Sequence, residues 1–374
     1  MSDHAHPPEH HHHGDAPSTV RPPKQEQEDA STEITEVAPG ILRSQLPISM
    51  PGLGHVNCYL LEDERGLAVV DPGLPGDESW DALGDRLGRA GFKVADVHTI
   101  VVTHSHPDHF GGAIRLRYET DADIVTHETF RTMWQEAELD DEEDSATLDV
   151  NSVDDRAAAL ERYFSRPNPW GGARSGPPPE FLERMRAAGE SMGGAFAVPS
   201  PTRPLTDGQT IKLARREWVA MHTPGHTYDH LCLLDPEHGV VLTGDHVLPS
   251  ITPHISGMSP QSDPLAEFFA SLIRMEELHD VTIALPAHGH PFEDLGGRAR
   301  HIIEHHEDRL DIIRDAQEQL PNGTVDDFMR VLFRERSWGE MAESETYAHL
   351  EHLRELGELS RSDTGGFAHY APTG

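Results

Sequence analysis

Apolar and polar residues follow two different periods along the chain, and these predict strands and helices in alternation. Between residues 34 and 71 the apolar runs are short, and VNCYLLE and LAVVD flank the polar turn DERG as in a β-hairpin. Over residues 78–90, Trp80, Leu83 and Leu87 recur on one helical face. A β-branched run at 99–102 predicts a buried strand. We expect a helix from Gly111, a strand at 123–126 and a helix to about residue 138 to follow.

Residues 138–205 break this pattern. LDDEEDSATLDVNSVDD is acidic, while PNPWGGARSGPPPEF and PSPTRP are rich in proline and glycine. Helical spacing recurs only around 154–164 and 180–190. We interpret the segment as an insertion, which serves either as a lid or substrate-facing cap, or as a solvated spacer.

Strands resume with TIKLA, EWVAMH, HLCLLD and GVVLTGD. A helix over 264–279, the strand VTIALP and a long helix over 298–319 come next. The last part of the chain has amphipathic patterns at 325–334 and 344–359, and SRSDTGGFAHY fits a small hairpin. This end fits a winged-helix module, and a plain helical or dimerising appendage explains it as well. Strands alternating with helices predict an α/β core.

The first 32 residues are polar and rich in His, Pro and Glu, so they cannot bury apolar surface and are predicted to be a disordered tail. The histidine run at 10–13 can bind a metal loosely, and we leave it out of the fold and of the catalytic site. The predicted organisation is therefore a tail (1–32), a catalytic core (33–300) that contains the insertion (138–205), and a C-terminal domain (301–374).

Charge limits the partners. The chain has 65 acidic and 30 basic residues, a formal net charge of −35, so nucleic acid and membrane surfaces repel it as a whole. A local basic patch is still compatible with that total. No apolar stretch approaches the ~20 residues of a membrane span, and the N-terminus lacks an apolar signal region. The two cysteines, Cys58 and Cys232, lie in apolar strand-like runs, which favours small buried side chains over a disulfide and predicts a cytoplasmic protein.

Candidate chemistry is concentrated in IVVTHSHPDHFGGA, residues 100–113, where His104, His106, Asp108 and His109 fall within six residues after the predicted strand. In an extended segment His104 and His106 point the same way and can share one ion. Asp108 and His109 lie just beyond and can serve a second ion. The alternative is a polar turn in a chain that has 27 histidines.

Three further stretches also end an apolar strand in a polar loop. WVAMHTPGHTYDH carries His226, VVLTGDHVL carries Asp245 and IALPAHGHP carries His288, each with a glycine close by. Glycine lets the backbone turn sharply and approach an ion. Imidazoles and carboxylates without a thiolate favour Zn²⁺, with Mn²⁺ or Fe as alternatives.

The ordered set T-H-S-H-P-D-H, P-G-H, T-G-D and P-A-H-G resembles the metallo-β-lactamase superfamily over roughly residues 36–300. The resemblance implies an αβ/βα sandwich with the metal site at one edge of the sheets. It also implies that Asp71, in VVDPG, buttresses the site without being a ligand. By position, the implied ligands are His104, His106 and His226 for a first metal, Asp108, His109 and His288 for a second, and Asp245 as a bridge.

The implied reaction is hydrolysis, in which two Zn²⁺ ions share a hydroxide that attacks a carbonyl or phosphoryl centre, with Asp108 and Asp245 as the catalytic carboxylates. The chain is similar to the glyoxalase II-like and β-lactamase-like branch, some members of which end in a winged-helix domain. We expect a small thioester, ester or lactone as substrate. His106 stands where diiron flavoproteins of the superfamily carry glutamate, which argues against a redox role. The alternatives are a metal-dependent nuclease and a non-catalytic metal-binding interaction protein, and a homodimer stays open.

Several other residues are close to these motifs in sequence. His55, His222, His230, His246 and His290 either orient ligands or are ordinary surface and packing residues. Tyr228 either donates a hydrogen bond to an oxyanion or packs. The helical histidines His301, His305 and His306 are expected to form a solvated face.

Overall fold

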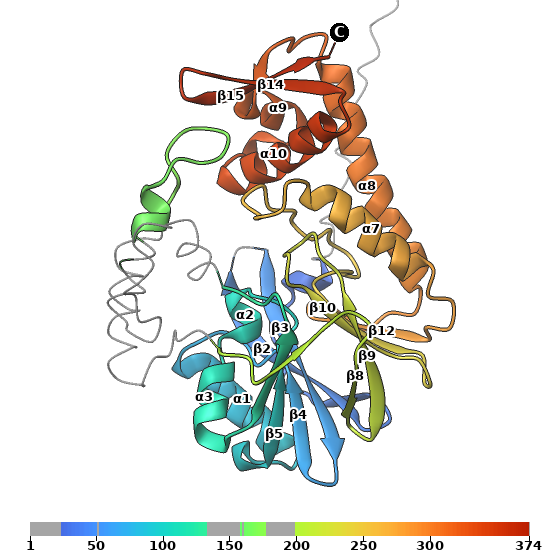
Figure 1. The fold of residues 1–374 in the computed structure, drawn as a ribbon. Helices are drawn as coiled ribbons and strands as arrows, with labels where there is room; N and C mark the ends of the chain where they lie inside the picture. The colour runs from blue at the N-terminus through green and yellow to red at the C-terminus, as the bar shows by residue number, and fades with distance from the viewer. Residues whose placement is uncertain (1–23, 51, 133–157, 159–160, 177–198, 374) are drawn as a thin grey trace, which may run out of the picture.

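Two β-sheets pack face to face with helices on both outer sides in the computed structural model (Figure 1). The structure describes residues 24–50, 52–132, 158, 161–176 and 199–373. No helix among these residues is both long enough and apolar enough to span a bilayer.

The first sheet has seven strands in sequence order: β1 (Thr35–Ala38), β2 (Ile41–Met50), β3 (Leu53–Asp63), β4 (Gly66–Val70), β5 (Val97–Val101), β6 (Asp123–His127) and β7 (Arg203–Leu205). β1 to β4 are antiparallel, and β4 to β7 are parallel. Helices α1 (Asp77–Arg89), α2 (Pro107–Phe110) and α3 (Ala113–Thr120) lie beside this sheet. Parallel pairing places the ends of β4, β5 and β6 at one edge.

The second sheet has the order β12 (Ile283–Pro286), β11 (Val240–Gly244), β10 (Leu231–Asp235), β9 (Arg216–His222) and β8 (Thr210–Leu213). β11 and β12 are parallel and the other neighbours are antiparallel. Helices α7 (Pro264–Glu276) and α8 (Leu295–Ala316) cover its outer face.

Side chains of successive strand residues point to opposite faces, and this produces the layers. Leu60, Val69 and Ile100 belong to the core between the first sheet and its helices. Their neighbours Tyr59, Val70 and Val101 belong instead to the core between the two sheets, together with Trp218 and Leu233. A third core lies between the second sheet, α7, α8 and the C-terminal elements. The predicted αβ/βα sandwich is confirmed.

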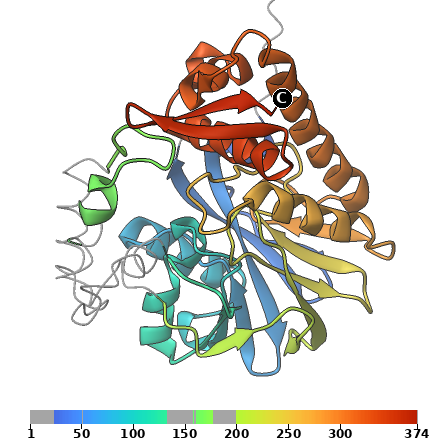
Figure 2. The same ribbon diagram turned by 45° about the horizontal axis from the view of Figure 1, so that its top comes forward.

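The C-terminal part contains β13 (Gly323–Thr324), α9 (Val325–Leu332), α10 (Glu340–Glu355), β14 (Leu359–Thr364) and β15 (Phe367–Pro372). β14 and β15 form the expected hairpin, and their turn places Gly365 and Gly366 at positive φ (63° and 83°). Figure 2 shows this hairpin lying across the helices. The helical character is confirmed, whereas the winged-helix identity stays a prediction.

The structure corrects part of the predicted tail. Residues 24–32 are ordered, with a short 3-10 helix (Gln25–Gln27), and Glu26 is fully buried where its carboxylate accepts hydrogen bonds from Ser250 and Ile251. These contacts tie the segment to the loop after β11, because a buried carboxylate needs such donors. The rest of the predicted tail, residues 1–23, lies outside the described residues.

Only parts of two predicted helices lie within the described residues. After β6 the chain turns through residues 128–132 without a helix, and the remainder of that predicted helix lies outside the described residues. Within the insertion, residues 158 and 161–165 are helical as predicted. The predicted helix at 180–190 also lies outside the described residues.

Candidate metal centre

Four strand ends meet at one edge of the sandwich. The 104–109 loop follows β5, His226 follows β9, Asp245 follows β11 and His288 follows β12. In the parallel pair β11–β12, Gly244 lies opposite Pro286, and this register places Asp245 and His288 side by side. All seven residues predicted as ligands come together, and they form two groups. Within each group the candidate ligand atoms, imidazole nitrogens and carboxylate oxygens, lie within 4.8 Å of one another.

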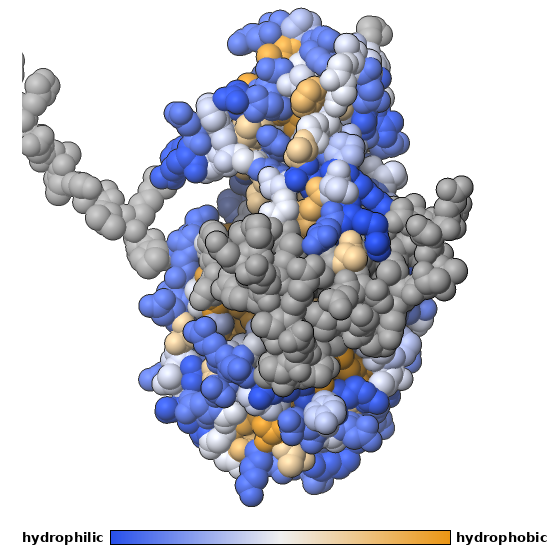
Figure 3. Space-filling view, turned by 90° about the vertical axis from the view of Figure 1, so that its left-hand side faces the viewer, coloured by the Kyte–Doolittle hydropathy of each residue, from blue (hydrophilic) through white to orange (hydrophobic). Residues whose placement is uncertain are grey.

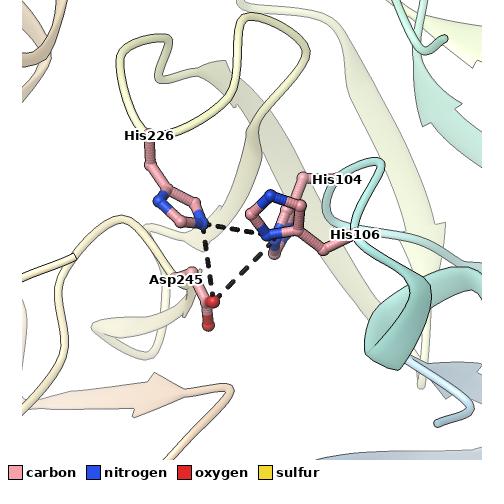
Figure 4. Close-up of side chains that lie close together, drawn as sticks. All are labelled: His104, His106, His226 and Asp245. Atoms are coloured by element: carbon pink, nitrogen blue, oxygen red, sulfur yellow. Dashed lines mark hydrogen bonds and ion pairs between the residues drawn. The ribbon is translucent and has the colours of Figure 1, made fainter. Parts of the chain in front are cut away.

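The first group is His104, His106, His226 and Asp245 (Figure 4). Nδ1 of His106 lies 3.0 Å from Nε2 of His104 and 3.2 Å from Nε2 of His226. With Zn–N bonds of about 2.0–2.1 Å and tetrahedral angles, two ligand nitrogens lie roughly 3.3 Å apart. The spacing of the three imidazoles therefore fits a tetrahedral ion.

The second group is Asp108, His109 and His288. Oδ2 of Asp108 lies 3.5 Å from Nε2 of His109 and 3.5 Å from Nε2 of His288. Asp245 lies between the groups: its Oδ2 is 3.6 Å from Nε2 of His226 and 3.5 Å from Nε2 of His109, while its Oδ1 is 3.3 Å from Nε2 of His288. Its carboxylate is therefore placed to contact ions in both groups.

Buried polar atoms at the centre fit bound cations. Nε2 of His109, Nε2 of His288 and Oδ1 of Asp245 are buried and have no hydrogen-bond partner among the described residues. An unpaired buried polar atom costs about 1–3 kcal/mol, so three of them facing one space indicate a ligand. A metal ion satisfies nitrogen lone pairs and carboxylate oxygens together.

Hydrogen bonds at the far side of each ring fix which nitrogen faces the centre. Nδ1 of His226 donates to the His254 carbonyl (2.7 Å), and Nδ1 of His288 donates to the His55 carbonyl (2.6 Å). A carbonyl oxygen only accepts, so each Nε2 keeps its lone pair in the neutral ring. Such outer contacts orient metal-binding imidazoles.

Asp71 orients ligands in the same way, as the family resemblance implied. Its carboxylate accepts from Nδ1 of His109 (2.9 Å) and from the backbone NH and hydroxyl of Thr103 (2.9 and 2.8 Å). The Thr103 hydroxyl gives its proton to Asp71 and so accepts from Nδ1 of His104 at 3.0 Å. Asp71 belongs to neither ligand group, and its φ of 54° is a left-handed conformation maintained by these contacts.

The buried carboxylates of the site also favour a positive charge beside them. Burial lowers the pKa of His106 to about 3 and holds that of His104 well below its usual value. Burial would also lower the pKa of His109, but the Asp108 and Asp245 carboxylates outweigh it and raise that pKa well above the usual value. In the chain alone a proton on His109 therefore balances the buried carboxylates, and this is a proton that a bound cation would replace.

The other histidines near the motifs are of two kinds: some support the loops that carry ligands, and others make contacts elsewhere. His55, His230 and His246 are fully buried, and Nε2 of His230 accepts from the Asp245 backbone NH at 3.0 Å. His230 and the His55 carbonyl therefore support ligand loops. His222 stacks on His127 with 3.8 Å between ring centroids, and His290 contacts Glu28.

The expectation of a solvated face at His301, His305 and His306 is wrong for His306. His306 is fully buried, and its Nδ1 lies 3.1 Å from Nε2 of His349 on α10. It lies four residues from both Ile302 and Leu310, which are buried on the same stripe of α8. That spacing is a signal that the sequence carried.

Sequence reasoning missed Asp229. It is fully buried beside the centre, where Ser105 Oγ donates to its Oδ1 at 3.0 Å and connects the 104–109 loop with the loop of His226. Burial raises the pKa of this carboxyl to about 7. A single aspartate in a His-rich loop carries no sequence signal of this burial.

We expect Asp229→Asn to change how stability depends on pH. The unfolded wild-type chain loses this proton near pH 3.8 and the folded chain only near pH 7, so wild-type stability falls as pH rises between these values. Asparagine does not titrate, so relative to the variant the wild type loses on the order of 4 kcal/mol across that range. Urea unfolding of both proteins at a series of pH values measures the difference. Parallel curves for the two proteins would contradict the assignment.

Comparison with known proteins places this geometry in a family. The sequence model described as "Metallo-beta-lactamase superfamily" matches residues 51–288. Among solved structures, a metallo-beta-lactamase family protein from Thermus thermophilus is 29% identical with a TM-score of 0.69, covering 90% of this chain and 100% of that one. A beta-lactamase domain protein from Burkholderia ambifaria is 27% identical with a TM-score of 0.70, covering 92% of this chain and 96% of that one.

The matches to curated relatives cover less of this chain. "Lactamase-like protein adaB" of Aspergillus niger is 25% identical over 69% of this chain, and the match spans only 57% of that relative's length. "Atrochrysone carboxyl ACP thioesterase" of Aspergillus fumigatus is 30% identical over 34% of this chain and 28% of its own length. The family match extends over more than half of the chain and includes every predicted ligand. The chain therefore belongs to the metallo-β-lactamase superfamily.

Proposed function

We propose that the protein is a dinuclear metal-dependent hydrolase of a small carbonyl substrate, with a thioester as the first class to test. The observation that carries the proposal is the position of the Asp245 carboxylate, whose two oxygens face imidazoles of both ligand groups. One side chain shared between two groups is suited to a pair of adjacent ions.

In this proposal His104, His106 and His226 would hold one ion, Asp108, His109 and His288 would hold the other, and Asp245 would contact both. Two Zn²⁺ ions, or Mn²⁺ or Fe in their place, would supply a water of low pKa and would neutralise charge that develops on the substrate oxygen. Hydrogen bonds to the Asp71 carboxylate and to the carbonyls of His254 and His55 would fix the orientation of the imidazoles that hold the ions.

The two carboxylates set the charge of the site. Burial alone would raise the pKa of Asp245, but the His288 and His109 imidazoles outweigh it and hold that pKa well below its usual value. Burial likewise opposes ionisation of Asp108, and the charge of His109 lowers its pKa. Both residues are therefore ionised. Two carboxylates among five neutral imidazoles would leave two bound divalent ions with a net positive charge, which would attract a carbonyl oxygen.

Relatives named thioesterases support the choice of thioester over ester or lactone. Tyr228, two residues after His226, lines a cavity of about 800 Å³. A phenol in that position is suited to donate a hydrogen bond to the substrate oxygen. The net charge of −35 counts against a nuclease.

Metal analysis of the purified protein, followed by thioester, ester, lactone and RNA substrates on the same sample, tests this function. We expect two equivalents of metal per chain and turnover of thioesters that a chelator removes and added metal restores. Bound metal without turnover of any carbonyl substrate would contradict the hydrolase and favour a binding protein. RNA cleavage that falls steeply with salt would favour the nuclease instead.

A further inference from the structure

A cavity of about 800 Å³ is lined in part by the loops that carry or orient a histidine of the metal centre. Its walls come from residues 163–174 of the insertion, from the loop at 257–264 and from α10. Two loops join it to the centre: Tyr228 lines it two residues after His226, and Gly257 lines it three residues after His254, whose carbonyl orients His226. The volume is that of a small-molecule site.

The charge of this cavity is opposite to that of the chain. Four arginines line it, Arg131, Arg166, Arg174 and Arg354, and Glu351 is the single carboxylate among the described residues of the lining. Glu351 is already paired with Arg354 at 2.7 Å. In a protein with 65 acidic and 30 basic residues, four guanidinium groups around one cavity indicate a site for an anion.

Contacts within the insertion hold one of these arginines in place. The guanidinium of Arg174 lies 4.2 Å from the centroid of the Tyr163 ring, and its NH1 donates to the Tyr163 carbonyl at 3.2 Å. Its Nε is buried and has no hydrogen-bond partner within the described part of the chain. Arg131, by contrast, is exposed and pairs with no carboxylate among the described residues. Both arginines can therefore offer donors to a ligand.

The insertion segment that supplies this wall is fixed to the C-terminal module. Trp170 is buried, its indole NH donates to Glu343 at 3.1 Å, and its carbonyl accepts from Ala368 at 3.0 Å. Figure 3 views the molecule from this side and shows mainly hydrophilic residues on the described surface, with small hydrophobic patches. A cap that helps to form a pocket is therefore favoured over a solvated spacer.

Guanidinium groups recognise phosphate oxygens through paired hydrogen bonds, and the cavity also has three tyrosines, Tyr163, Tyr228 and Tyr347, that suit a flat ring. We propose that this cavity binds the phosphorylated half of a thioester substrate, an acyl-coenzyme A. The inference rests on the proposed hydrolase function. In such a thioester the pantetheine arm lies between the phosphates and the carbonyl. One molecule can therefore place its phosphates in this cavity and its carbonyl group at the metal centre.

The reaction needs no further reactant than water. Water oxygen bonds to the carbonyl carbon, the C–S bond breaks, and the products are a carboxylate, a free thiol and one proton. A small thioester is favoured over one attached to an acidic carrier protein. The large acidic surface of a carrier protein would be repelled by the net negative charge of the whole chain. A small anion at the arginines would not, because salt screens charges that lie more than about 8 Å away.

Two thioesters with the same acyl group isolate the phosphates: acyl-coenzyme A and acyl-pantetheine. We expect the metal-loaded full chain to hydrolyse the coenzyme A ester with a kcat/KM at least tenfold higher, and high salt to reduce that preference. Arg131→Gln and Arg174→Gln should each lower kcat/KM for the coenzyme A ester about tenfold, mainly through KM, and leave the pantetheine ester within about twofold. Arg89→Gln, an exposed arginine on α1, is the matched control.

Equal kcat/KM for the two esters in the wild type would overturn the proposal, and so would faster turnover of the same acyl group on a carrier protein. Binding of adenosine 3′,5′-bisphosphate, measured by calorimetry, separates this inference from the hydrolase function. We expect binding by the wild type that the double variant Arg131→Gln/Arg174→Gln loses. Binding without any thioester turnover would support the phosphate site and contradict the hydrolase, and no binding would contradict the site.

Discussion

Replacing Asp245 with alanine is expected to reduce hydrolysis by about 10³-fold or more and to lower the metal content of the purified protein. Its carboxylate faces both ligand groups, so in the proposed site its loss would remove a ligand from each ion. Removal of a single charge-stabilising group at an active site typically costs about 10²–10³-fold, and here the metals are weakened as well. Metal analysis and turnover of a thioester on the same preparation measure both effects.

The fold should survive this change, because Asp245 is a polar residue of a loop and is not a member of the three hydrophobic cores. Circular dichroism and the urea midpoint should therefore stay close to those of the wild type measured without metal. His106→Ala should behave in the same way. Asp311→Ala, an exposed carboxylate on α8, is the matched control and should keep full activity and metal. Full turnover in the Asp245 or His106 variant would contradict the assignment of the site.

The second large effect is expected from Gly225→Ala. Gly225 has a φ of 133°, and a Cβ there would lie 2.3 Å from Cβ and 2.5 Å from Cα of Phe268 on α7. Because a helix backbone cannot yield by an ångström, the loop has to move, and His226 is its next residue. We expect a loss of stability of about 3 kcal/mol or more, together with weaker metal binding. Urea unfolding and metal retention against a chelator measure the two.

Gly208→Ala separates close packing from backbone conformation. Gly208 also has a positive φ, 77°, but no heavy atom of the described residues lies within 4 Å of the place that a Cβ would take. This control should cost only about 1–2 kcal/mol and leave metal retention unchanged. Equal losses in the two variants would show that the approach to α7 has no role in placing His226.

Much of the fold was predictable because its signals are local. The continuous apolar run that includes Tyr59, Leu60 and Leu61 marks a strand buried on both faces, and the structure places its residues alternately in two cores. The hairpin at the C-terminus was equally visible, since its turn needs the glycine pair. Boundaries were less exact: the helix predicted over 78–90 is found at Asp77–Arg89, whereas the one predicted over 344–359 begins and ends four residues earlier, at Glu340–Glu355.

Errors occurred where a residue's environment comes from distant elements. His306 looked like part of a polar helix face, yet α10 covers it and His349 approaches its ring. Residues 24–32 looked disordered by composition, but Glu26 finds donors in Ser250 and Ile251, more than 220 positions away. Asp229 had no signal because its burial depends on Ser105 from another loop.

The sequence by itself determined which side chains can hold a metal, because the spacing of His104 and His106 and the position of each motif after a strand are properties of consecutive residues. Only the tertiary structure decided that these side chains converge. The parallel register of β11 and β12 places Asp245 beside His288, and Asp71 reaches His109 from the end of a neighbouring strand. The same holds for the arginine-lined cavity, whose described walls are contributed by five separate segments. Pairing between strands and packing between layers are long-range contacts, and they set distances that no local pattern encodes.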